Sequence, residues 1–126
     1  MDRHARRGLV LTILFAILLL ILSILPGDMT SAPGGFYFQG MDKVMHAIMY
    51  GVFSLLVTNV YLAFYRVRFW PLVFIVLITW FYSILMEILQ LYLVETRSGE
   101  LLDAVANLAG IIMGTLIFLG YKKIRS

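Results

Sequence analysis

Four long apolar stretches divide the chain, and short polar connections separate them. The stretches cover residues 8–25, 44–65, 71–93 and 101–119. Each is close to the length of about 20 residues that an α-helix needs to cross the hydrocarbon core of a bilayer. The pattern predicts an all-α fold, in which a single domain over residues 1–126 forms a polytopic membrane protein with a four-transmembrane-helix bundle.

The first stretch follows Arg3, Arg6 and Arg7 and therefore resembles a signal peptide in its charge and its apolar core. The apolar core is longer than the roughly 7–15 residues of such peptides, and no small-x-small cleavage site follows it at once. Pro26 and Gly27 end the stretch. We expect an uncleaved first helix rather than a removed signal.

The basic residues predict the orientation of the bundle, because Lys and Arg that flank transmembrane helices are retained on the cytoplasmic side. Eight of the ten basic residues fall at the two termini and in the connection after residue 65, and only Lys43 and Arg97 fall on the other side. We therefore expect a multi-pass protein of the cytoplasmic membrane with both termini cytoplasmic. The eight are Arg3, Arg6, Arg7, Arg66, Arg68, Lys122, Lys123 and Arg125.

The composition supports a membrane protein and excludes several kinds of site. The chain is 62% hydrophobic and 13% charged, whereas soluble domains have roughly 45–50% apolar and about 25% charged residues. The absence of cysteine excludes disulfides, thiolate metal sites and a cysteine nucleophile. Because the basic residues behind the net charge of +3 flank apolar stretches, their expected partners are anionic lipid headgroups of the bilayer rather than nucleic acid.

Polar residues interrupt the last three stretches near the ends that the charge pattern places outside. Within each stretch they are three, four or seven residues apart, so they share one face of a helix. Three such faces at one depth predict a polar cluster inside the bundle. The three faces are Lys43, His46 and Tyr50; Ser83, Glu87 and Gln90; and Asp103 and Asn107, which Gly110 and Gly114 continue along the helix.

Gly110 and Gly114 continue the polar face of the last stretch as a small-xxx-small surface, which lets another helix backbone approach closely. We expect helix packing at these two positions. A charged side chain at the bilayer centre costs about 2.5–3.5 kcal/mol on insertion scales. We therefore expect Lys43 and Arg97 to neutralise the carboxylates of the cluster.

The polar positions also form an ordered set with defined spacings: Asp42-Lys43-x2-His46-x3-Tyr50, then Glu87-x2-Gln90, then Arg97-x5-Asp103-x3-Asn107-x2-Gly110-x3-Gly114. This set resembles the signature of the VanZ-like family of bacterial membrane proteins. The family takes its name from a protein linked to resistance to teicoplanin, a glycopeptide antibiotic that binds cell-wall precursors at the outer surface. The resemblance implies a role in the bacterial envelope.

His46, Glu87 and Asp103 are the candidate catalytic residues. An imidazole beside a carboxylate is suited to act as general base on a water or a lipid hydroxyl, in phosphoryl or acyl transfer. The same residue types bind zinc or manganese. Because the spacing contains no local metal motif such as HExxH, the sequence predicts no metal, and the cofactor stays open. The candidate substrate-binding residues are Asp42, Lys43, Tyr50, Gln90, Arg97 and Asn107.

Two functions of different classes remain open at this point. In the first, the cluster binds or modifies a lipid-linked or amphiphilic envelope substrate at the outer leaflet and affects glycopeptide susceptibility. In the second, the chain is a non-enzymatic accessory or scaffold subunit that packs against a larger envelope enzyme or transporter. A structural register device needs only one or two polar groups, so the size of the cluster favours a binding or catalytic site. The sequence leaves enzyme activity and oligomeric state open.

Overall fold

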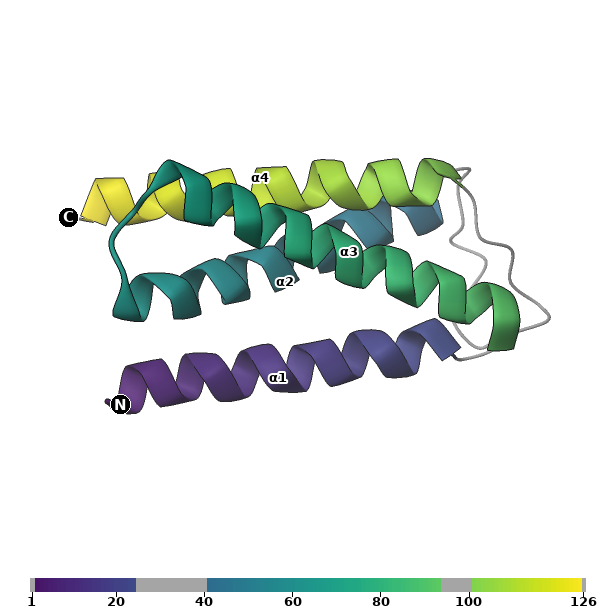
Figure 1. Ribbon diagram of the computed structural model, residues 1–126, viewed down its shortest axis with the longest axis horizontal. Helices are drawn as coiled ribbons and strands as arrows, with labels where there is room; N and C mark the ends of the chain where they lie inside the picture. Colours follow the sequence, from purple (N-terminus) through teal and green to yellow (C-terminus); the bar gives the residue numbers. More distant parts are fainter. Residues whose placement is uncertain (1, 25–40, 94–100, 126) are drawn as a thin grey trace.

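The computed structural model describes residues 2–24, 41–93 and 101–125 of the protein. Within these ranges the fold is all-helical, and each helix is long and apolar enough to cross a membrane. The prediction of a four-helix membrane protein is therefore confirmed. The helices are α1 (Arg3–Ile24), α2 (Met41–Phe64), α3 (Phe69–Leu93) and α4 (Leu101–Arg125), shown in Figure 1.

Two helix ends extend well beyond the apolar stretches that predicted them. At the start of α1, the backbone N–H of Ala5 donates to Asp2 Oδ1 at 2.7 Å, so Asp2 caps the helix before the apolar residues begin. At the other end of the chain, α4 continues through Lys122 and Lys123 to Arg125. The apolar stretch ends at residue 119, whereas α4 continues to Arg125.

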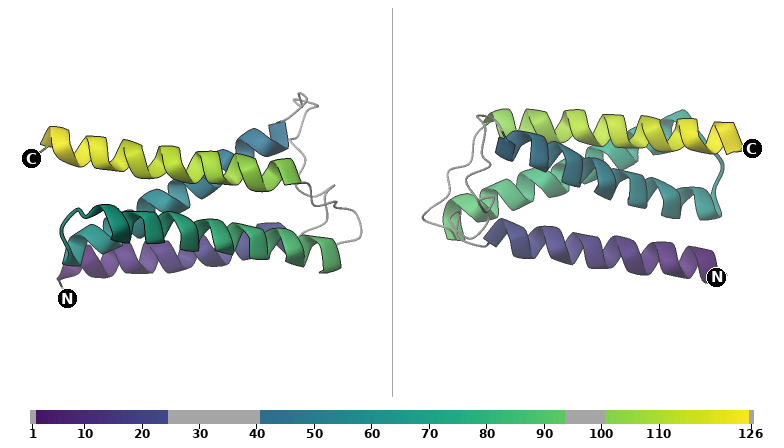
Figure 2. Two further views of the ribbon diagram at one scale, coloured as in Figure 1. Left: turned by 45° about the horizontal axis from the view of Figure 1, so that its top comes forward. Right: turned by 180° about the vertical axis from the view of Figure 1, so that it is seen from behind.

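The four helices form an up-down bundle in which α2 and α4 run in the same direction (Figure 1). Both termini and the connection between α2 and α3 lie at one end, and the start of α2, the end of α3 and the start of α4 lie at the other. In the views of Figure 2, α2 crosses α4 at an angle. The polar positions of the last three helices therefore share the end opposite the termini.

Glycine contacts set the close approach of α2 and α4. A Cβ atom at Gly110 would overlap the backbone carbonyl of Ala47, and one at Gly114 would overlap the carbonyl of Gly51. No side chain fits between the helices at these points. The two positions predicted for helix packing thus lie in direct backbone contact with α2.

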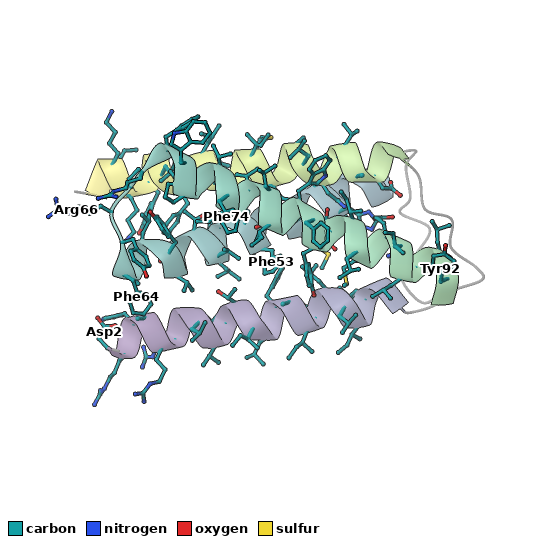
Figure 3. All side chains as sticks on the ribbon, viewed as in Figure 1. Asp2, Phe53, Phe64, Arg66, Phe74 and Tyr92 are labelled. Atoms are coloured by element: carbon teal, nitrogen blue, oxygen red, sulfur yellow. The ribbon has the colours of Figure 1, made fainter. Side chains whose placement is uncertain are left out.

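Neutral polar groups hold the middle of the bundle together. The hydroxyls of Ser54 and Thr115 are hydrogen-bonded across α2 and α4 at 2.5 Å. On another side, the Tyr82 hydroxyl of α3 donates to the carbonyl of Ala16 on α1 at 2.6 Å. Phe53, labelled in Figure 3, packs against Tyr82 with the ring centroids 5.2 Å apart. These contacts join the helices without charged groups.

Candidate functional site

Three helices bring His46, Glu87 and Asp103 to one place inside the bundle. A potential ligand atom of each residue lies within 4.8 Å of those of the other two. His46 Nδ1 and Glu87 Oε1 are 3.8 Å apart. The residues come from α2, α3 and α4 respectively, so the bundle itself assembles the candidate catalytic residues. We call this trio the outer cluster, after the side of the membrane that the basic residues predict for it.

The outer cluster is largely shielded. The side chains of Glu87 and His46 are 12% and 23% exposed, and Asp103 as a whole residue is 4% exposed. The histidine is therefore the most accessible member of the outer cluster. The two carboxylates are more buried, in surroundings that screen charge poorly.

The charges within the outer cluster do not balance by themselves. The three side chains carry at most one positive charge, on His46, against two carboxylates. Two carboxylates this close repel each other strongly when both are ionised in a poorly solvated site. Such a site favours the binding of a positive group or ion. Of the predicted neutralising residues, Arg97 lies outside the described residues, as do the side chains of Lys43 and its neighbour Asp42.

Asn107 lies one helical turn after Asp103 and is completely buried. Within the part of the chain that the structure describes, neither Oδ1 nor Nδ2 of Asn107 has a hydrogen-bond partner. A buried amide left in this state costs about 1–3 kcal/mol. The amide of Asn107 is therefore available to a ligand or to a bound water.

Three buried hydroxyl groups of the bundle differ from Asn107 because each has a partner on its own helix. Thr58 donates to the carbonyl of Ser54 at 2.8 Å, Thr79 to that of Ile75 at 2.7 Å, and Ser83 to that of Trp80 at 2.7 Å. Hydroxyl groups satisfied by their own helix are ordinary structural features. The amide of Asn107 thus differs from these buried hydroxyl groups in having no hydrogen-bond partner among the described residues.

Tyr50 and Gln90 are buried at 4% and 5% exposure, next to the outer cluster along their own helices. Tyr50 lies one turn after His46 and belongs to the apolar core with Leu19, Phe53 and Ile111. Gln90 lies three residues after Glu87 on α3.

Trp80 is a positioning residue that the sequence interpretation missed. Its Nε1–H donates to the carbonyl of Ala104, the residue after Asp103, at 3.0 Å. This bond joins α3 to α4 beside the outer cluster. The residue lies three positions before Ser83 and seven before Glu87, so its place on the polar face of α3 was a usable signal.

The chain matches no protein-family profile, no curated protein and no solved structure.

Proposed function

We propose that this protein is a VanZ-like membrane protein of the bacterial envelope whose outer cluster binds the headgroup of a lipid-linked or amphiphilic substrate at the outer leaflet. The observation that carries the proposal is the convergence of His46, Glu87 and Asp103, from three helices, within 4.8 Å. The resemblance of the ordered polar positions to the VanZ-like signature supports the envelope role.

A purely structural role explains the outer cluster poorly, because neutral contacts already join the same helices elsewhere. Ser54 and Thr115 connect α2 to α4, and Trp80 connects α3 to α4 through the Ala104 carbonyl. Ionisable residues within membrane-spanning segments are costly and mark functional sites by default. The outer cluster adds charge where the bundle needs none for cohesion, which favours a functional site.

The depth of the site suits the headgroup of an amphiphile. Asp103 lies in the first turn of α4, and Glu87 lies six residues before the end of α3 at Leu93. At about 1.5 Å per residue, Glu87 is roughly 9 Å inside its helix end. A substrate with its acyl or prenyl chain in the lipid would place its polar part at this level.

His46 is the residue that handles protons in this proposal. With Nδ1 facing Glu87 Oε1, the carboxylate orients the imidazole and leaves Nε2 for a substrate hydroxyl or a water. Lys43 and Arg97 hold an anionic headgroup, and the Asn107 amide orients it. Modification of an envelope lipid or cell-wall precursor at this level changes the target that glycopeptides meet.

The test compares His46→Ala with the wild-type chain in a bacterial host exposed to teicoplanin. The matched control is His4→Ala, because His4 is exposed and lies at the opposite end of the bundle. We expect His46→Ala to abolish the change in teicoplanin susceptibility and in the mass spectrum of envelope lipids, at unchanged protein abundance. An unchanged phenotype in His46→Ala, or losses that only follow lowered abundance, would contradict the proposal.

A further inference from the structure

We infer that the outer cluster is a metal centre, in which His46, Glu87 and Asp103 bind one divalent ion of the zinc or manganese kind. The inference deepens the proposed function and rests on it in taking the outer cluster to be a functional site. It names the cofactor that the site uses and revises one role. With Nδ1 on the ion, His46 is a ligand, and a water bound to the ion replaces the imidazole as the group that exchanges protons with the substrate. Metal binding is measured on the purified protein and does not depend on the envelope phenotype.

The geometry of the outer cluster is close to that of an occupied site. Zinc lies about 2.0–2.2 Å from imidazole nitrogen and carboxylate oxygen, so two ligand atoms at a tetrahedral angle are roughly 3.4 Å apart. His46 Nδ1 and Glu87 Oε1 are 3.8 Å apart, and all three ligand atoms lie within 4.8 Å of one another. Binding one ion therefore requires the ligand atoms to move closer together, from separations of up to 4.8 Å to roughly 3.4 Å.

Charge provides the second argument. Two carboxylates and a neutral imidazole around a divalent ion form a site with no net charge. Neutrality matters here because uncompensated charge inside a membrane-spanning bundle is costly. The ligand chemistry also fits, since imidazole and carboxylate together suit zinc and manganese.

Asn107 supplies an independent observation. Its amide is completely buried beside Asp103, and neither polar atom has a hydrogen-bond partner among the described residues. Residues around a metal characteristically hydrogen-bond its ligands or its bound water. An ion with a bound water next to Asp103 would give this amide the partner that the described side chains do not provide.

Three protein ligands are typical of catalytic rather than structural metal sites, which use four. The remaining position takes a water or an oxygen of the substrate. In a site at headgroup depth, the expected occupant is an anionic oxygen of a lipid-linked substrate. His46 is the most exposed of the three ligands at 23%, so a substrate oxygen has its easiest access beside the imidazole.

The experiment titrates Zn²⁺ into the full-length protein in detergent after removal of metals with a chelator, and measures binding by calorimetry and bound metal by mass spectrometry. We expect one Zn²⁺ per wild-type chain, at least a 100-fold weaker affinity in Asp103→Asn, and a 10- to 100-fold weaker affinity in Asn107→Ala. His4→Ala is the matched control, because His4 and Asp2 line a separate 430 Å³ pocket at the other end of the bundle. Loss of the zinc in His4→Ala, or equal binding by wild type and Asp103→Asn, would overturn the inference.

A measurement on the wild-type protein avoids any dependence on how the variants fold. With Mn²⁺ bound, electron spin-echo envelope modulation should detect a single imidazole nitrogen coupled to the metal. The absence of nitrogen coupling would overturn the inference. One metal per chain together with an unchanged phenotype in His46→Ala would contradict the proposed function alone, whereas the His46→Ala phenotype without metal binding would contradict the metal centre alone.

Discussion

Gly110 of α4 lies directly against the backbone carbonyl of Ala47 on α2, with no space between them for even a methyl group. Ala47 follows His46 in the chain, and Gly110 lies seven residues after Asp103 on the same helical face. The contact therefore holds the helix that carries the histidine against the helix that carries the aspartate. The close packing of Gly110 against Ala47 therefore also helps to bring His46 and Asp103 together.

Gly110→Ala is expected to destabilise the protein by about 3 kcal/mol, the upper part of the range for overpacking, because the methyl group meets backbone that no rotamer change can move. Unfolding in mixed detergent measures the loss. Gly120→Ala is the matched control, since a Cβ there meets nothing within 4 Å. Equal stability of the two variants would show that α2 and α4 are not in contact at Gly110.

The hydrogen bond between Ser54 and Thr115 is expected to contribute modestly. Thr115 donates its only proton to the carbonyl of Ile111 at 3.0 Å, so Ser54 is the donor across the helices. A double-mutant cycle with Ser54→Ala and Thr115→Val should give a coupling of about 0.6 kcal/mol, the average for interhelical hydrogen bonds in membranes. Thr79→Val controls for the loss of a buried hydroxyl that bonds only to its own helix. Additive single-mutant effects would contradict the interhelical bond.

Trp80→Phe removes the hydrogen bond to the Ala104 carbonyl and should lower stability by about 0.5–1.5 kcal/mol. Because the bond fixes α3 beside Asp103, the same change should weaken Zn²⁺ binding several-fold. Zinc titration and detergent unfolding of the variant check both effects. Trp70→Phe is the control, since Trp70 is 74% exposed. Unaltered zinc affinity in Trp80→Phe would show that this tryptophan does not position the outer cluster.

The sequence predicted the helices well because the length of an apolar stretch and the thickness of a bilayer are matched physical quantities. It predicted helix ends less well, since the cap at Asp2 and the polar last turns of α4 lie outside the apolar pattern. Helical periodicity predicted which faces His46, Glu87 and Asp103 occupy. It could not predict their separations, because these depend on how the helices cross.

Two contacts of the site depend on how the helices pack, so the sequence indicates the faces involved but not the contacts themselves. Trp80 donates a hydrogen bond to a backbone carbonyl of α4, and the pattern of side chains on α4 gives no indication of such a bond. Likewise, the unsatisfied state of Asn107 depends on which groups the folded bundle places around it. Periodicity identifies the inner face of a helix, but only the fold shows which polar groups on that face find partners.

The orientation of the bundle can be tested directly, because the chain contains no cysteine and single cysteines can be introduced without background. Arg66 lies at the end that holds the termini, and Tyr92, which is 83% exposed, lies at the opposite end (Figure 3). If basic residues are retained in the cytoplasm, a membrane-impermeant maleimide should label Tyr92→Cys in intact spheroplasts and Arg66→Cys only after permeabilisation. The reverse pattern would place the outer cluster on the cytoplasmic side. The substrate would then have to be an inner-leaflet lipid, because His46, Glu87 and Asp103 share the end of the bundle that carries Tyr92.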